Sequence, residues 1–395
     1  MTDLPVRREK PRVNWIFHPR VRSVVIQFLL VALVALVAWF IYRTTSRNIA
    51  AQRIPIGFDF FWIESGFSIS QALIPFSENN TYARAFLVGL LNTLLVSALG
   101  LIFATVIGFL VGIGRLSNNW IVSRLCGTYV EVIRNLPLLF QILFWYLAVL
   151  AALPVPRQSI SLAGDVFINN RGIMIPKPLF GEGIGMVSLL ALAGILLSLI
   201  VAGISRRYRI RTGRRITLWP AYLLLVIAAP LAAFLYLGVS VEIDKPVLKG
   251  FNFNGGVRVI PEFLALLIAL STYTAGFIAE IVRAGVLAVP KGQSEAASAL
   301  GLRRSPQLRL IIVPQALRVI IPPLTSQYLN LIKNSSLAVS IGYPDLVSVF
   351  AGTTLNNTGQ AIEILGITML VYLFISLVVS FGMNLYNRRI ALKER

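Results

Sequence analysis

The sequence is poor in residues that bind transition metals or form covalent cross-links. It contains a single cysteine, Cys126, and a single histidine, His18, among 395 residues. One cysteine cannot form an intramolecular disulfide, and a structural zinc site needs about four cysteine, histidine or carboxylate ligands. We therefore expect no disulfide framework, no metal site and no histidine proton relay.

Charged residues are also scarce. They make up 13% of the chain, whereas 56% of its residues are hydrophobic; a soluble domain averages about 25% charged residues. The formal net charge of +20 could indicate nucleic-acid binding. However, the basic residues lie between long apolar runs, where they set membrane topology. The composition therefore predicts an integral membrane protein that contacts lipid and binds no nucleic acid.

Signatures of catalysis are missing as well. No GxxxxGK[ST] phosphate-binding loop occurs in the sequence, so we expect the chain to bind neither ATP nor any other cofactor. Glu131, Glu280 and Glu363 fall at or near the ends of apolar runs, and only Asp345 falls well inside one. A proton relay needs several ionisable groups within the membrane. The chain is therefore not expected to be an enzyme, and an ATP-driven activity would require hydrolysis by another subunit.

Eight apolar runs approach the roughly 20 residues that a helix needs to cross a bilayer. Lipid offers no hydrogen-bond partners to the backbone, so each run is predicted to be helical, in an all-α fold with about eight transmembrane helices. The runs cover 24–42, 85–114, 129–153, 186–204, 217–238, 260–283, 335–352 and 362–386. The run 335–352 contains Gly342, Pro344 and Asp345. A re-entrant or surface segment there, leaving seven spans, is the alternative.

The distribution of basic residues predicts the orientation. Most of the 36 lysine and arginine residues lie in the N-terminal tail, the loop 206–215, the stretch 283–333 and the C-terminal tail. The positive-inside rule places these segments, and hence both termini, in the cytoplasm. The run 24–42 is followed by RTTSRN, without a small-residue cleavage site. We therefore predict an uncleaved first helix and not a signal peptide.

One polar segment interrupts the apolar C-terminal half: residues 290–314 read PKGQSEAASALGLRRSPQLRLIIVP. Ser294 can cap a short helix, and Gly301 can end it in the left-handed conformation. Pro306 suits the first turn of a second helix, which Pro314 would limit. The pattern predicts a cytoplasmic helical hairpin whose small side chains would let a soluble partner approach closely. A loop that only reverses the chain is the alternative.

This hairpin resembles the EAA loop of ABC-transporter permease subunits. In that motif EAA is followed by three residues, glycine, nine residues and I-x-L-P; here EAASALG and IIVP match, with Val313 in place of leucine. NTLLVSALG (92–100), YVEVIRNLPLLFQI (129–142) and the stretch 269–346 resemble the polar amino-acid permeases of this superfamily. The added N-terminal span and the insertion 154–259 resemble the larger membrane subunit of the general L-amino-acid permeases.

The resemblance implies a type I ABC-importer permease core and roles for particular residues. Coupling to the ATPase is implied for Glu295, Ala296, Ala297, Gly301, Leu302, Arg303, Pro306, Ile311 and Pro314. A place near the translocation path is implied for Asn92, Thr93, Lys333, Asn334, Ser335, Ser336 and Leu337, although Lys333 could instead snorkel to the membrane boundary. Two pairs at i and i+3, Glu131 with Arg134 and Glu280 with Arg283, are predicted to face each other at helix ends.

Four segments follow from this comparison. Residues 1–84 hold the N-terminal tail, the first span and an external segment, and 85–153 the first part of the permease core. Residues 154–259 are the insertion with two further spans, and 260–395 the second part of the core with the hairpin.

The resemblance implies a permease subunit of a bacterial inner-membrane ABC importer for polar L-amino acids. Its partners would be a second related permease subunit, an ATPase dimer that binds ATP and magnesium, and a periplasmic amino-acid-binding protein. An ion-gradient-driven secondary transporter and a non-transporting membrane scaffold are the alternatives.

Overall fold

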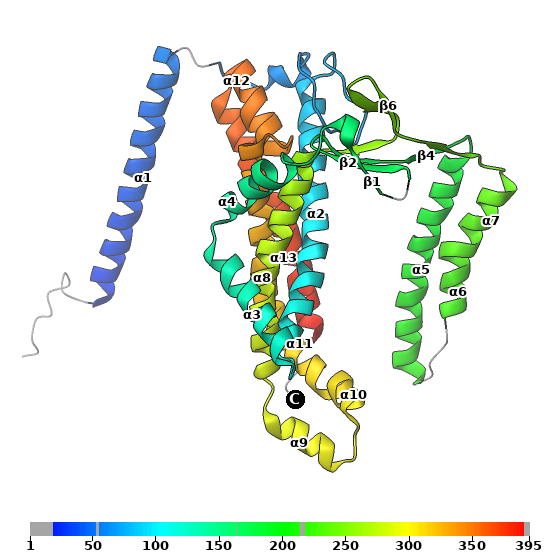
Figure 1. The fold of residues 1–395 in the computed structure, drawn as a ribbon. Coiled ribbons are helices and arrows are strands. Elements are labelled where there is room, and N and C mark those ends of the chain that lie inside the picture. Colours follow the sequence, from blue (N-terminus) through cyan, green and yellow to red (C-terminus); the bar gives the residue numbers. More distant parts are fainter. Residues whose placement is uncertain (1–18, 53–54, 163, 214–217, 391–395) are drawn as a thin grey trace, which may run out of the picture.

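The protein is described by a computed structural model that covers residues 19–52, 55–162, 164–213 and 218–390. It is built mainly from long helices whose axes are roughly aligned (Figure 1). The long helices are α1 (Pro19–Gln52), α2 (Tyr82–Gly114), α5 (Ile184–Thr212), α8 (Pro261–Leu287), α11 (Val313–Asn334) and α13 (Ala361–Ile390). His18 and the outer parts of both tails, and part of the arginine loop, lie outside the described residues.

The expected helical membrane fold is confirmed. Seven helices in the described part of the chain are long and apolar enough to cross a membrane, and eight if one bent pair counts as a single span. Six of the eight predicted runs coincide with straight or gently curved helices at nearly the predicted positions. The other two runs differ from the prediction.

The run 129–153 is not one straight helix. The chain forms α3 (Trp120–Asn135), bends by 106°, and continues as α4 (Leu138–Leu143) and the π-helical turn η3 (Phe144–Leu150). Pro137 causes the break, because its ring excludes the helical conformation at the preceding residue. Leu136 accordingly has extended backbone angles, φ −95° and ψ 130°.

The prediction of a span at 335–352 is wrong, and the span lies just before it. Helix α10 (Arg304–Gln307), the π-helical turn η6 (Leu308–Ile312), α11 and the 3₁₀ turn η7 (Ser335–Ile341) form one apolar unit of 38 residues. Polar residues of α11 such as Gln327 and Asn330 concealed this run in the sequence. Gly342 then ends the helix with φ 71°, before η8 (Val347–Thr354) and α12 (Leu355–Thr358).

The core is the contact between α2 and α8, which pack along much of their length. Small residues of α2 make this possible: a Cβ atom at Gly112 would lie 2.7 Å from the carbonyl oxygen of Ala279, and one at Gly108 would lie 2.6 Å from Ile278. In lipid, such close approach through small residues is a main source of helix association. Helix α11 packs against both α8 and α13 and completes the bundle.

The insertion forms a separate layer. Helix α5 packs against one further span, which is made of α6 (Trp219–Leu223), the π-helical turn η5 (Leu224–Ala228) and α7 (Ala229–Tyr236). These two spans stand away from the bundle in Figure 1. Short antiparallel strands connect them to the core. They are β1 (Ile160–Leu162), β2 (Val166–Asn169), β3 (Gly172–Ile175), β4 (Lys177–Phe180), β5 (Val241–Asp244), β6 (Val247–Lys249), β7 (Asn252–Asn254) and β8 (Val257–Val259).

These strands lie outside the predicted spans and add a β-layer to the helical fold. β1-β2-β3-β8 make one sheet, whereas β4-β5 and β6-β7 are two-stranded. The pairing of Ile173 with Val259 joins the start and the end of the insertion. Two short 3₁₀ turns, η2 (Asp59–Trp62) and η4 (Pro156–Gln158), lie in the connecting segments.

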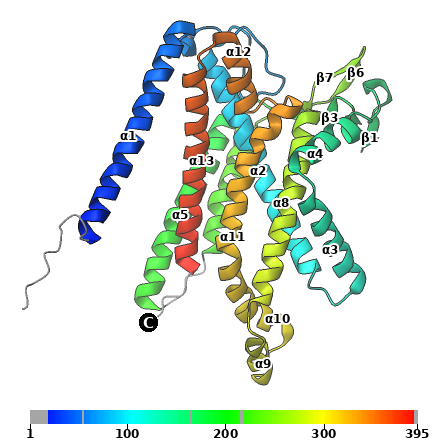
Figure 2. The same cartoon turned by 90° about the vertical axis from the view of Figure 1, so that its left-hand side faces the viewer.

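One end of the bundle carries the hairpin, α9 (Lys291–Ala299) with α10. The first residues of α1 and the last residues of α13 lie toward this same end, as both views show (Figures 1 and 2). The strands lie at the opposite end. This arrangement matches an even number of crossings.

Candidate functional site

The first helix of the hairpin, α9, begins earlier than predicted. It starts at Lys291 after Pro290, whose backbone is extended (φ −59°, ψ 136°). Ser294 is therefore inside the helix and does not cap it. Its carbonyl oxygen instead accepts a hydrogen bond from Nε2 of Gln307 at 2.8 Å, which ties the second helix of the hairpin to the first.

The predicted turn at Gly301 is confirmed. Gly301 has φ 69°, a left-handed conformation that glycine adopts without steric cost. The amide of Leu302 donates to the carbonyl oxygen of Ala297 at 3.1 Å, and that of Gly301 donates to Ser298 at 2.9 Å. This pair of bonds defines a Schellman motif, which satisfies the last carbonyl groups of α9.

The second helix of the hairpin does not stop at Pro314. It begins at Arg304, so Pro306 lies in its first turn, where backbone amides have no helical partner. The helix then widens into the π-helical η6 and continues through Pro314 into α11. A π-helical turn relaxes the regular bonding that an interior proline would break. The hairpin is therefore mechanically continuous with a membrane span.

The exposed surface of the hairpin differs from the predicted coupling set at two residues, Ala297 and Leu300. Glu295 and Ala296 are exposed, but the side chain of Ala297 is only 1% exposed and packs inside the hairpin. Leu300 is 79% exposed and was not among the predicted coupling residues. A large apolar side chain at the tip of a polar hairpin, next to an EAA sequence, is the signal that could have identified it.

Asn92 and Thr93, predicted near the translocation path, are fully buried. They hold the segment after η7 against α2. Nδ2 of Asn92 donates to the carbonyl oxygen of Pro344 at 2.9 Å, and Oγ1 of Thr93 accepts from the amide of Leu346 at 2.9 Å. The hydroxyl of Tyr343 donates to the carbonyl oxygen of Asn92 at 3.1 Å. We call this network the α2 lock.

The other predicted path residues lie at the end of α11 and in η7. Lys333 is exposed, Ser335 is buried, and Asn334, Ser336 and Leu337 are half-buried. Only Asn334 among these five lines a cavity between α8 and α11, of about 240 Å³, together with Gln327 and Asn330. These three side chains are spaced i, i+3 and i+7, so they share one face of α11. The sequence analysis did not single out Gln327 or Asn330, and the place of Asn334 on the translocation path stays a prediction.

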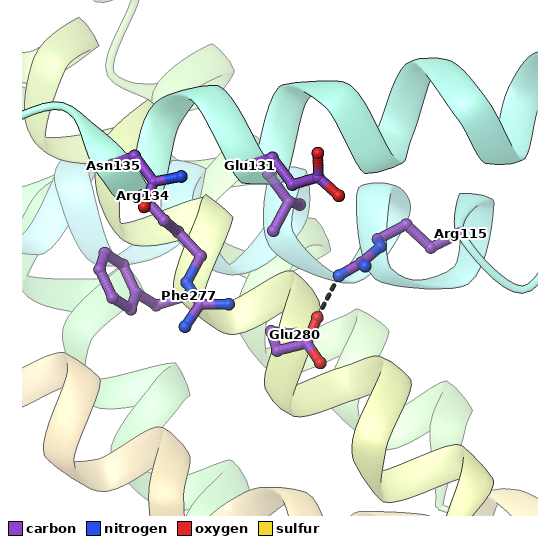
Figure 3. Close-up of a pocket in the computed structure, with 7 residues that line it drawn as sticks. Arg115, Glu131, Arg134, Asn135, Phe277 and Glu280 are labelled. Atoms are coloured by element: carbon purple, nitrogen blue, oxygen red, sulfur yellow. Dashed lines mark hydrogen bonds and ion pairs between the residues drawn. The ribbon is translucent and has the colours of Figure 1, made fainter.

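Charged side chains gather where the end of α2, α3 and α8 meet (Figure 3). The predicted pair of Glu280 and Arg283 is confirmed, with Oε1 and Nη2 2.6 Å apart. Glu280 also pairs with Arg115 from the end of α2. One carboxylate therefore joins two arginines that come from two helices.

The predicted pair of Glu131 and Arg134 does not form. No salt bridge involves Glu131 in the described part of the chain. The guanidinium group of Arg134 lies 5.1 Å from the ring centre of Phe277 on α8, an attractive cation–π geometry. Glu131 and Arg134 both line a cavity of about 410 Å³ together with Glu280. Residues of both predicted pairs thus line the same cavity, but of the two pairs only Glu280 and Arg283 form an ion pair.

Fold and hairpin together define a multi-pass helical membrane protein that presents a helical hairpin at one end of its bundle. Residues 104–392 match the family of binding-protein-dependent transport system inner membrane components. The match covers more than half of the chain, so the protein belongs to this family of permease subunits. It is a multi-pass inner-membrane component of a transport system and is not itself an enzyme.

Two curated proteins are similar over nearly their whole length. The putative amino-acid ABC transporter permease protein YhdX of Escherichia coli (strain K12) is 52% identical over 379 residues, covering 96% of both chains. The general L-amino acid transport system permease protein AapQ of Rhizobium johnstonii is 50% identical, covering 96% of this chain and 94% of its own. They place the protein among the amino-acid ABC permeases.

Among solved structures, a chain described as an amino acid ABC transporter with histidines is 21% identical. It has a TM-score of 0.46 and covers 78% of this chain and 95% of its own.

Proposed function

We propose that this protein is the larger permease subunit of an ABC importer for polar L-amino acids. It forms the translocation path with a second, related permease subunit, and a periplasmic binding protein delivers the substrate. A separate ATPase dimer binds ATP and magnesium. The proposal is supported by similarity to YhdX and AapQ over nearly the whole chain and by the absence of a phosphate-binding loop.

The observation that carries the ATPase-coupling role is the form of the hairpin. Its tip exposes Glu295 and Leu300 on a short helix that is closed by the Schellman turn at Gly301. An exposed leucine beside small residues can fill a pocket in a soluble partner, and burying its side chain removes apolar surface from water. The second helix of the hairpin passes directly into a membrane span, so movement of the docked partner reaches the bundle.

The hairpin end of the bundle is cytoplasmic in this proposal, because the basic residues concentrate there. Both termini then lie in the cytoplasm and the β-layer faces the periplasm, where the binding protein docks. The polar face of α11, with Gln327, Asn330 and Asn334, contributes to the path. Binding of ATP drives transport only if it favours one of two states of the path.

Co-purification from native membranes tests the coupling role. Glu295→Arg and Leu300→Glu should each lower the amount of ATPase that co-purifies at least tenfold. A substitution at a residue that is central to an interface costs about 2 kcal/mol or more of binding free energy. Arg124→Glu is the matched control: Arg124 is exposed on α3, outside the hairpin sequence, and its change should leave the ATPase bound. All variants should retain the second permease subunit.

Retention of the ATPase by both hairpin variants would show that the hairpin is only a loop. Uptake by the isolated chain in liposomes without ATP would support the ion-gradient-driven alternative instead. Binding of partners without any solute flux would support the scaffold alternative.

A further inference from the structure

A second concave surface lies at the hairpin end of the bundle and is unrelated to the polar cavities described above. It is a groove of about 890 Å³ between the end of α2, the start of α3, the end of α8 and the helix formed by α10, η6 and α11. Its walls are almost entirely aliphatic or aromatic, from Phe109 and Ile113 on one side to Ile312 and Ile320 on the other. We call it the α2–α11 groove.

The groove is open to the outside of the bundle. Leu110 is 66% exposed, Ile113 is 59% exposed and Leu308 is 42% exposed, so an apolar occupant would cover substantial hydrophobic surface. The groove reaches as far into the bundle as Ile320, four turns from the start of the helix at Arg304. A soluble protein cannot fill such a surface within the bilayer, whereas an acyl chain can.

The mouth of the groove is basic. Arg304 lies on its rim, and an adjoining cavity of about 500 Å³ is lined by Arg304, Ser305, Leu308, Arg309 and Val313. Among the described residues, no carboxylate lines either the groove or this cavity. The opposite rim carries the polar residues Ser117 to Asn119. The site therefore has an apolar interior and a cationic entrance at Arg304, the residue at which the apolar span begins.

We propose that the α2–α11 groove binds an anionic phospholipid from the leaflet at the hairpin end. The acyl chain lies in the groove, and the phosphate of the headgroup lies between Arg304 and Arg309. Arginine suits this role because its planar guanidinium group forms two parallel hydrogen bonds with a phosphate. The basic entrance selects anionic lipids over zwitterionic ones, and the apolar interior supplies affinity that does not depend on headgroup.

The position of the groove gives the lipid a structural consequence. Its walls come from the fixed α2–α8 core on one side and from the helix that leaves the hairpin on the other. A bound lipid fills the space between them and stabilises η6, where the regular α-helical bonding is interrupted. The proposal does not depend on what the permease transports.

Native mass spectrometry of the intact transport complex tests the assignment. The complex is reconstituted with equal amounts of phosphatidylglycerol and phosphatidylcholine of the same acyl chains. The number of lipid molecules of each kind that stay bound to the complex in the mass spectrometer is then counted. Wild-type complex should retain phosphatidylglycerol preferentially. Arg304→Gln and Arg309→Gln should each reduce this retention about fivefold, because a basic residue near an anionic headgroup contributes about that much.

Two further variants complete the design. Arg124→Gln removes an exposed arginine of α3 that does not line the groove, and it should leave retention unchanged. Ile113→Trp fills the groove and should reduce binding of both lipids. Each variant is first checked for an unchanged subunit composition, so that loss of lipid is not caused by loss of the fold.

Three results would overturn the proposal. The first is equal retention of the two lipids, and the second is the same loss with Arg124→Gln as with Arg304→Gln. The third is an efficient disulfide between Ile113→Cys and a cysteine on the second permease subunit, because a protein would then cover the groove.

Discussion

Thr93 provides the sharpest test of the α2 lock. Its hydroxyl accepts a hydrogen bond from the amide of Leu346 at 2.9 Å, and both residues are 0% exposed. Thr93→Val keeps the shape of the side chain but leaves a buried amide without an acceptor, which costs about 1–3 kcal/mol. Thr93→Ser keeps the acceptor and removes one methyl group, which costs about 1 kcal/mol. The more hydrophobic substitution should therefore be the more damaging one.

Hydrogen–deuterium exchange separates these two effects. The amide of Leu346 should exchange faster in Thr93→Val, and it should stay protected in Thr93→Ser even if both variants lose some thermal stability. The measurement uses a peptide that spans residues 343–350, and a peptide from the α5 region serves as the reference. If the Val variant protects this amide as well as the wild type does, the bond does not hold the segment against α2.

Two further pairs of substitutions test the packing of the bundle. Gly112→Ala should lower thermal stability because its Cβ would lie 2.7 Å from a carbonyl oxygen of α8. Gly127→Ala is the control: its Cβ would meet no described atom within 4 Å, so this variant should be neutral or stabilising. Helix propensity alone would favour alanine by about 1 kcal/mol at both sites. Glu280→Gln leaves two arginines without their shared carboxylate and should cost about 1–3 kcal/mol after allowance for partial exposure. Glu131→Gln removes a charge that forms no salt bridge in the described residues, and it should change stability little. Equal losses of stability in Glu280→Gln and Glu131→Gln would contradict the pairing of Glu280 with the two arginines.

Length and hydropathy were enough to predict most of the spans, because lipid forces an apolar run to become a helix. They did not predict helices that are held in the bundle by packing against other helices and that carry polar residues. Gln327 and Asn330 make α11 too polar to stand out, although the helix is held by α8 and α13. In contrast, the apolar run 335–352 could not remain helical through Gly342 and Pro344. The strands of the insertion escaped prediction because they are only three or four residues long.

The hairpin was predictable because local signals define it. Gly301 ends a helix by its own conformational freedom, and the sequence therefore located the turn correctly. The capping role of Ser294 was wrong because the bend at Pro290 had already started the helix. The pairing of Glu280 with Arg115 joins residues that are 165 positions apart. No local pattern could show that contact, nor that Arg134 would pack against Phe277 of α8 instead of pairing with Glu131.

The structure also connects the hairpin with the α2 lock through a single element. From Arg304 to Asn334 the chain is helical throughout, with the π-helical turn η6 between α10 and α11, and η7 then leads to Tyr343 and Leu346, which bond to α2. Packed interfaces shift between discrete arrangements rather than deforming continuously. In the proposed coupling, movement of the hairpin would be transmitted along this helix, and the α2 lock is where that movement would reach the opposite end of the bundle. A hairpin anchored only by a flexible loop could not act on the membrane spans in this way.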